Sequence, residues 1–343
     1  MQKIVLLGAT GSIGDQTLSV LQEYPDQFQV VGMSARVNAE KLVELCRIFD
    51  CGAYYLSEAA TGDAEQVLKL EDLMTEEVDH LIVADHGLES YQIVLKALTM
   101  RKRVSIANKE LIMVHGPDLV YLAQEQRTTL IPIDSEHNGI FQCLQGERIE
   151  DVRRVIITAS GGPFLDRSWQ EVTDVTVEEV LNHPNWSMGS KTTVDSATLV
   201  NKAFEVIETH QLFGIPYDQI EVRLHPESIV HSIVEFTDGN VKMLAYPPDM
   251  RHAIGHCLFY PQRAPGLLTG ADKKLAQFDQ DLHFVRLEDG RYPCFDFVTE
   301  TARKKPFSLA QLVKNDQWAV DEFLRGKIAF GDILECLQDG LNT

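Results

Sequence analysis

Three acidic side chains in this sequence have the type and placement that hold a divalent cation. Asp134 and Glu136 follow the apolar run LIPI (130–133), so two carboxylates at positions i and i+2 come directly after a predicted strand. Glu205 lies in a predicted helix within VDSATLVNKAFEVIE (194–208). Oxygen ligands with no histidine or cysteine at matching spacing favour Mg²⁺ or Mn²⁺ over zinc. The alternatives are a solvated turn for the first pair and an ordinary exposed helix face for the second segment.

A second set of polar residues has the chemistry of a phosphate site. Hydroxyl groups follow a predicted strand in TASGGP (158–163) and begin a predicted helix, capped near Asp195 or Ser196, in DSAT (195–198). An amide and an ammonium group come within the next turn of that helix. Neutral donors, helix-terminus amides and one cation together suit a phosphate group. The residues concerned are Ser160, Ser196, Thr198, Asn201 and Lys202.

The chain opens with a glycine pattern that is typical of dinucleotide binding. The apolar run KIVLLG (3–8) leads into GATGSIG, which places Gly8, Gly11 and Gly14 at a strand-to-helix turn. Glycine lets the backbone approach a pyrophosphate, and a helix that begins near Ser12 offers amide groups to it. The alternative is a tight turn that binds nothing. After the second predicted strand, SARVN carries Arg36 and no acid, which favours NADP over NAD because arginine suits a 2′-phosphate.

These candidate residues need elements to position them, and the first part of the chain predicts a doubly wound parallel sheet. Short apolar runs alternate with segments that carry apolar residues at helical spacing, a pattern typical of βαβ units. The predicted strands are 3–8, 29–34, 53–56, 80–84, 103–107 and 130–133, and the predicted helices are 16–22, 39–48, 91–100 and 118–126.

The character of the chain changes after Ser135. A strand that runs into a small-residue turn within 152–162, a long helix over 198–213 and three strands within 220–246, which we expect to be antiparallel, predict an α+β region, and the tail over 296–337 is mostly helical. The fold class is therefore α/β, with a Rossmann-like N-terminal domain, a central α+β catalytic domain and a small C-terminal helical domain. The predicted boundaries are 1–133 and 134–263 for the first two domains, 264–287 for a linker, and 288–343 for a short last domain.

Composition and charge limit the classes of partner. The formal net charge of −20 is spread along the chain and disfavours nucleic acid or an anionic membrane surface, since both would repel it. Six scattered cysteines without CxxC spacing indicate thiols in a reducing compartment. The N-terminus does not have the pattern of a signal peptide, and no apolar run approaches the ~18 residues of a membrane span. We therefore expect a cytoplasmic globular protein.

Eight ordered motifs make the chain similar to a known family. The motifs are GATGSIG (8–14), ANKE (107–110), IDSEH (133–137), ASGGPF (159–164), HPNWSMG (183–189), VDSATLVNKAFE (194–205), HPESIVHS (225–232) and PPDMR (247–251). Together they resemble the 1-deoxy-D-xylulose 5-phosphate reductoisomerase family, from residue 1 to about residue 335. That family makes 2-C-methyl-D-erythritol 4-phosphate in the non-mevalonate isoprenoid pathway.

The resemblance implies roles at the substrate and metal. Asp134, Glu136 and Glu205 hold Mg²⁺ or Mn²⁺ in this interpretation, and Lys109 lies near the reacting groups. A loop over 182–190 forms a lid, although by itself an aromatic in such a loop fits equally well as a clip onto the core. The implied substrate-binding residues are Ser135, Glu136, Ser160, His183, Trp186, Ser196, Asn201, Lys202 and Glu205.

The resemblance also implies NADPH as the cofactor, a phosphorylated sugar as the substrate, and a homodimer. Two methionines, at positions 188 and 250, are expected to pack near the nicotinamide. The implied cofactor-binding residues are Gly8, Thr10, Gly11, Ser12, Ile13, Arg36, Asn38, Asn108, Glu110, Met188, Gly189 and Met250.

Several positions depart from the family pattern and keep two alternatives open. An apolar Gly-Ala-Ala-Gly turn is replaced by ADHG (84–87), and the chain ends soon after GDILECL (331–337), where relatives continue. One alternative is a paralogous NADP-dependent enzyme for a different phosphorylated sugar. The other is a catalytically silent nucleotide-binding regulator, which the retained carboxylates disfavour. The departing residues are Arg36, Val37, Asp85, His86, Leu111, Ser190 and KNDQW (314–318).

Overall fold

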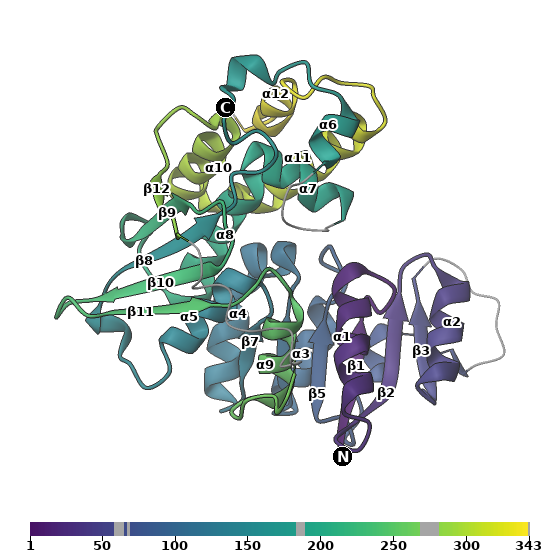
Figure 1. Ribbon diagram of the computed structural model, residues 1–343. Helices are drawn as coiled ribbons and strands as arrows, with labels where there is room; N and C mark the ends of the chain where they lie inside the picture. The colour runs from purple at the N-terminus through teal and green to yellow at the C-terminus, as the bar shows by residue number, and fades with distance from the viewer. Residues whose placement is uncertain (58–64, 67–68, 183–188, 268–280, 342–343) are drawn as a thin grey trace. The chain divides into compact units, whose positions relative to one another are not determined.

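The chain divides into two compact units. The computed structural model describes all residues except 58–64, 67–68, 183–188, 268–280 and 342–343 (Figure 1). The first unit comprises Met1–Asn138 and Asp249–Lys274, and the second comprises Gly139–Pro248 and Leu275–Thr343. The segment from Asp249 thus groups with the N-terminal part of the chain, whereas the predicted boundaries placed it with the residues from 134. The finer division into three domains and a linker stays a prediction.

The first unit contains a seven-stranded, fully parallel sheet in the order β4-β3-β2-β1-β5-β6-β7. This confirms the predicted doubly wound α/β architecture. Strand β5 is buried along its whole length, as expected for a parallel strand covered on both faces. The strands are β1 (Gln2–Leu7), β2 (Phe28–Ala35), β3 (Ala53–Leu56), β4 (Glu65–Gln66), β5 (His80–Val83), β6 (Arg103–Ile106) and β7 (Leu130–Pro132).

Strand order reverses around β1, which pairs with β2 on one side and β5 on the other. Ligands of open α/β sheets bind outside the carboxyl ends of the strands at such a switch point. The connecting helices are α1 (Ser12–Glu23), α2 (Ala39–Ile48), α3 (Tyr91–Thr99) and α4 (Lys109–Glu125). Helix α4 starts nine residues before the predicted 118, because Asn108 caps its first turn by accepting a hydrogen bond from Leu111 N (2.8 Å).

Helix α9 (Arg251–Phe259) completes the first unit by packing against α1. The ring centroids of Tyr24 and Phe259 lie 4.8 Å apart in an edge-to-face arrangement, and Phe28 meets the same ring at 5.1 Å. Aromatic pairs of this geometry add to the energy of burial. A segment more than 220 residues from α1 in sequence is therefore part of the core of the first unit.

The second unit contains a five-stranded mixed sheet in the order β11-β10-β8-β9-β12. Strands β10 and β11 are antiparallel as predicted, but β9 pairs with β8 in parallel and does not pair with β10. The expectation of three mutually antiparallel strands is wrong for β9, because a long helical connection from β8 returns it beside that strand in the same direction. The strands are β8 (Val152–Ala159), β9 (Ile220–Leu224), β10 (Val230–Phe236), β11 (Val241–Ala245) and β12 (Val285–Arg286).

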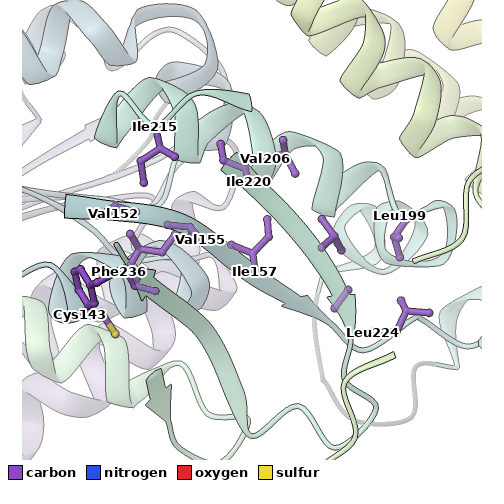
Figure 2. Close-up of a cluster of buried hydrophobic side chains, with 14 of the residues drawn as sticks. Cys143, Val152, Val155, Ile157, Leu199, Val206, Ile215, Ile220, Leu224 and Phe236 are labelled. Carbon is purple, nitrogen blue, oxygen red and sulfur yellow. The ribbon is translucent and has the colours of Figure 1, made fainter. Parts of the chain in front are cut away.

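A hydrophobic cluster joins this sheet to its helices (Figure 2). Val155 and Ile157 of β8 are fully buried, and Leu199 and Val206 reach the same core from the helical segment. Leu199 has a left-handed backbone (φ 61°), so it ends one helix and precedes the next. Burial of its side chain accompanies this backbone conformation, which is uncommon for a leucine.

The predicted helix over 198–213 corresponds to α8 (Val200–Phe213), with Thr198 in the preceding helix α7 (Ser190–Thr198), but the predicted cap near Asp195 or Ser196 is wrong. Those two residues lie in the last turns of α7, before the break at Leu199. The mostly helical tail is confirmed. Among the described residues, no helix combines the length and apolarity needed to cross a membrane. The remaining helices are α5 (Ser135–Cys143), α6 (Val177–Leu181), α7 (Ser190–Thr198), α8 (Val200–Phe213), α10 (Pro293–Lys304), α11 (Leu309–Leu324) and α12 (Ile333–Gln338).

Candidate active site

The glycine turn stands at the switch point of the first sheet, between β1 and α1. Gly8 has φ +73°, and a Cβ on it would lie 2.4 Å from the Ala84 carbonyl oxygen. A Cβ on Gly14 would lie 2.3 Å from the Gly8 carbonyl oxygen. Both distances are shorter than Cβ contacts in proteins, so packing alone requires glycine at these two positions.

Gly11 differs from its two neighbours in the motif. A Cβ on Gly11 would lie 3.4 Å from the Gly8 oxygen, an ordinary contact, so packing does not demand glycine there. Gly11 is the N-cap of α1, and no side chain in the described part of the chain caps that helix. The amides of Ser12 and Ile13 belong to the first turn, whose N–H groups have no partner within a helix. The turn therefore fits a pyrophosphate that comes close to Gly11.

The end of β2 carries the residues expected to face a 2′-phosphate. Arg36 follows the strand, and the Asn38 side chain caps α2 by accepting a hydrogen bond from Lys41 N (3.1 Å). The Lys41 ammonium donates to the Thr10 carbonyl (3.3 Å) and to Asp15 (2.7 Å). Lys41 was not predicted from the sequence as a site residue. It adds a second cation near the end of β2 and links α2 to the glycine turn.

The start of α4 lies beside the same switch point. The Asn108 side chain is fully buried and donates to Asp85 (3.0 Å) and to the Gly87 carbonyl (2.8 Å). Glu110 is 9% exposed, and its Oε2 has no hydrogen-bond partner in the described part of the chain. A buried acceptor without a partner fits the expectation that Glu110 faces a ligand.

Lys109 and Asp134 form an ion pair at the carboxyl ends of β6 and β7. His137 Nδ1 lies 3.3 Å from the second oxygen of the same carboxylate. Burial opposes ionisation of Asp134, but the charge of Lys109 and the contact with His137 outweigh it and hold the pKa of Asp134 well below its usual range. The carboxylate is therefore ionised at neutral pH, which is the form that binds a cation.

The two residues after Asp134 extend this acidic edge. The Glu136 amide donates to Asp134 Oδ1 at 3.3 Å, and the Ser135 hydroxyl donates to the Glu136 carboxylate. Ser135 is buried, whereas Glu136 is partly exposed. The first unit thus brings together Lys109, Asp134, Ser135 and Glu136, as the sequence predicted.

In the second unit, the turn after β8 packs directly against the end of α7. Gly162 has φ +67°, and a Cβ on it would lie 2.8 Å from the Ser196 carbonyl oxygen and 3.1 Å from Ala197 Cα. The Ser160 hydroxyl accepts a hydrogen bond from Gly162 N (3.3 Å) in the same turn. The structure therefore brings the segments of Ser160 and Ser196 together, although DSAT ends a helix where we expected it to begin one.

Helix α8 carries three interacting polar side chains in its first two turns, directly after the break at Leu199. Asn201 donates to Glu205 Oε1 at 2.5 Å, and the Lys202 ammonium forms an ion pair with the other oxygen. Lys202 is 5% exposed and Glu205 is 1% exposed. Because both charged side chains are buried, the alternative of an ordinary exposed helix face is excluded. A buried ion pair also has a desolvation cost that a surface pair does not have.

A further, partly buried cation in the second unit was not predicted from the sequence. The Lys191 ammonium pairs with Asp195 at 2.6 Å and with Asp316 of α11. Burial alone would lower the pKa of Lys191, but the two carboxylates raise it above its ordinary value. Lys191 therefore fixes α7, and with it Ser196, to a helix near the C-terminus.

The remaining predicted site residues lie outside the described part of the chain, at the starts of helices, or in the second unit. His183, Trp186 and Met188 of the expected lid lie outside the described residues, so the lid stays a prediction. Gly189 is the N-cap of α7 and Met250 is the N-cap of α9. Glu205 belongs to the second unit, whereas Asp134 and Glu136 belong to the first.

Three family models match successive parts of the chain. The model described as 1-deoxy-D-xylulose 5-phosphate reductoisomerase matches residues 4–116. Its C-terminal domain matches 130–213, and a further DXP reductoisomerase C-terminal domain matches 246–343. The chain is 43% identical to 1-deoxy-D-xylulose 5-phosphate reductoisomerase of Bacillus subtilis (strain 168) over 357 residues, which cover 99% of this chain and 92% of the relative. Identity to the enzyme of Bacillus pumilus (strain SAFR-032) is 42% over 359 residues, covering 100% and 92%.

Solved structures agree with the sequence relatives. A crystal structure of DOX-P reductoisomerase in complex with NADPH, fosmidomycin and magnesium matches with a TM-score of 0.88 at 33% identity, covering 99% of this chain and 90% of that one. The enzyme from Zymomonas mobilis in complex with NADPH matches with a TM-score of 0.87 at 32% identity, covering 99% and 91%. The chain belongs to the 1-deoxy-D-xylulose 5-phosphate reductoisomerase family.

Proposed function

We propose that this protein converts 1-deoxy-D-xylulose 5-phosphate to 2-C-methyl-D-erythritol 4-phosphate in the non-mevalonate isoprenoid pathway, with NADPH and a divalent cation. The observation that carries this proposal is the match to the family over essentially the whole chain, with Asp134, Glu136 and Glu205 all present. No finding favours a different phosphorylated sugar, and retained carboxylates speak against a silent nucleotide-binding regulator.

The cation is Mg²⁺ or Mn²⁺, held by Asp134, Glu136 and Glu205. Support comes from the chemistry of the donors, which are all carboxylates, and from the related structures solved with magnesium. When bound, the cation polarises the substrate's carbonyl and NADPH supplies the hydride. Lys109 and Lys202 each hold one of these carboxylates in the free protein and thereby limit the repulsion between like charges.

The substrate phosphate binds in the second unit, to Ser160, Ser196, Asn201 and Lys202, with His183 assisting from the lid. This assignment is supported by the contact between Gly162 and the Ser196 backbone, and by the buried ammonium of Lys202. Ser135 contacts the sugar hydroxyls at the other end of the substrate. Trp186 covers the sugar chain and excludes water from the reacting carbons. This prevents side reactions of the reactive intermediate with water.

NADPH binds at the glycine turn of the first unit. Support comes from Gly11, because packing within the protein does not require a glycine at this position. The first turn of α1, which has no side-chain cap, supports it as well. The phosphate of the adenosine ribose is held by Arg36 with the adjacent α2 terminus. Other residues assigned to the cofactor are Gly8, Thr10, Ser12, Ile13, Asn38, Asn108, Glu110, Met188, Gly189 and Met250.

We further propose a homodimer in the cytoplasm. Strand β11 is an edge strand of its sheet, and its Val241 and Met243 are 50% and 51% exposed. An apolar edge of this kind suits pairing with another chain. All six cysteines are free thiols, as is usual in a reducing compartment. Light scattering on the purified protein tests the dimer directly.

The proposed reaction is tested by following NADPH absorbance with the named substrate and Mg²⁺ or Mn²⁺. We expect metal-dependent oxidation of NADPH, and a loss of kcat/KM of at least about 100-fold for Glu205→Gln. Glu208→Gln is the matched control, because it changes another fully buried carboxylate on α8. Calorimetry with Mn²⁺ alone provides a second readout, in which we expect only Glu205→Gln to weaken the binding of Mn²⁺. Absence of turnover by the wild-type protein, with NADPH still bound, would exclude this substrate.

A further inference from the structure

An aspartate, Asp85, lies in the loop directly after β5, where the family resemblance led us to expect an apolar turn. A Cβ on Gly8 would lie 2.7 Å from the Asp85 amide nitrogen, so the backbone of Asp85 is in close contact with the glycine turn. An acid beside a pyrophosphate site would repel the ligand if its carboxylate faced it. The effect of Asp85 on a bound pyrophosphate therefore depends on the direction in which its carboxylate points.

The Asp85 carboxylate is bonded within the protein. Its Oδ1 accepts hydrogen bonds from Asn108 Nδ2 at 3.0 Å and from the Ser90 hydroxyl at 3.2 Å. Both donors are fully buried. Burial raises the pKa of Asp85, while these two hydrogen bonds act in the opposite direction. Hydrogen bonds to a carboxylate are stronger than those between neutral groups, so losing one of them loosens the loop.

Asn108 is committed by the same network. Its Nδ2 also donates to the Gly87 carbonyl at 2.8 Å, and its Oδ1 accepts the Leu111 amide at 2.8 Å to cap α4. The side chain thus has one bond to the loop after β5 through Asp85, a second through Gly87, and a third to α4. The next residue, Lys109, pairs with Asp134.

We propose that Asp85 is a positioning residue for NADPH, which fixes the loop 84–90 to the start of α4 beside the glycine turn. The proposal rests on the proposed function, in which NADPH binds at this turn. Asp85 need not touch the cofactor. It holds the backbone next to Gly8 in one arrangement before the cofactor arrives, and it directs its own charge toward Asn108 and Ser90.

The test measures NADPH affinity of the full-length protein by fluorescence titration, for Asp85→Ala and Asp85→Asn. Alanine removes the acceptor, and we expect Kd for NADPH to rise by about tenfold or more, with a smaller change in kcat. Asparagine keeps an acceptor oxygen at the same place, so we expect its Kd to stay within about threefold of wild type. Hydrogen exchange of the amides of 84–90 in the free protein should accelerate in the alanine variant only.

Asp79→Ala is the matched control. Asp79 precedes β5 at its opposite, amino end and accepts a hydrogen bond from Lys3 N at 2.8 Å. We expect this variant to lose stability without losing NADPH affinity. If Asp85→Ala does not fold, Ser90→Ala removes one of the two donors and should raise Kd by a smaller factor.

Three outcomes would overturn the proposal. The first is unchanged NADPH affinity in Asp85→Ala, and the second is an Asp85→Asn variant as damaged as the alanine variant. The third is an equal loss of affinity in Asp79→Ala, which would indicate a general effect of destabilisation. If the wild-type protein bound no NADPH, the proposed function would fail instead. Exchange of 84–90 in the free protein would then decide separately whether Asp85 holds this loop.

Discussion

The glycine turn of the first unit and helix α8 of the second unit, the two proposed phosphate sites, are built by different means. The first is built from backbone, with two glycines that packing requires and a third, Gly11, that it does not. The second is built from side chains, with the Lys202 and Glu205 charges almost fully buried. A site built from backbone amides carries no full charge, so it needs no compensating group in the protein when no ligand is bound. A buried ion pair must be satisfied internally at all times, so its members depend on each other.

The strongest test of this difference removes one member of the buried pair. Lys202→Met leaves the Glu205 carboxylate buried without its cation, so we expect the free energy of unfolding to fall by about 3–5 kcal/mol. Urea denaturation in the absence of divalent metal measures this loss. The double variant Lys202→Met/Glu205→Gln should recover most of it, because the uncompensated charge is gone. A single variant as stable as wild type would show that the pair is solvated in solution.

A test of intermediate size compares two basic side chains, one in each unit, at acid pH. Burial lowers the pKa of His80 in β5 to about 3, whereas the pKa of Lys191 in α7 is raised by Asp195 and Asp316. An unfolded histidine has a pKa of about 6.5. Between these values only the unfolded chain binds the proton, so stability falls as pH falls, by about 1.4 kcal/mol per pH unit.

His80→Gln should therefore flatten the dependence of unfolding free energy on pH between about 6.5 and 4. Titration of Lys191 itself does not contribute to that slope, because a raised lysine pKa stabilises fully below the unfolded value of about 10.4 and the stabilisation is lost only above it. Denaturant titrations at several pH values decide the point. Parallel curves for wild type and His80→Gln would mean that His80 protonates without unfolding.

The smallest effect separates binding from packing within the glycine turn. Gly11→Ala adds a Cβ that meets only an ordinary contact, so we expect an unchanged melting temperature and a Kd for NADPH raised about tenfold. Gly14→Ala should destabilise the free protein by about 1–3 kcal/mol, because its Cβ collides with the Gly8 oxygen. Gly52→Ala, where no atom lies within 4 Å of the added Cβ, serves as the control. Normal NADPH affinity in Gly11→Ala would place the pyrophosphate elsewhere.

The first unit could be predicted closely from sequence because its information is local. Buried parallel strands are continuous apolar runs, and the glycine spacing follows a strand directly, so the six main strands and the turn were found. Strand β4 has only two residues and gives no such signal. The start of α4 was missed because its cap, Asn108, follows the strand β6 almost at once.

The second unit was harder because its determinants are distant in sequence or local but ambiguous. Thr198 and Leu199 fit helical periodicity, and nothing in their types announces the left-handed backbone at Leu199. The Lys191–Asp316 pair of the second unit joins residues 125 positions apart. Such partners become visible only when the chain is folded.

The contact between Gly162 and the Ser196 backbone also has a genetic consequence. Every amino acid that a mutated glycine codon can specify carries a Cβ, so no single-residue change at position 162 avoids the clash with a main chain that cannot swing aside. Gly87 has a similar positive φ but open space around it. In a library of all single variants, position 162 should therefore tolerate no replacement, while position 87 accepts residues such as asparagine that adopt this backbone.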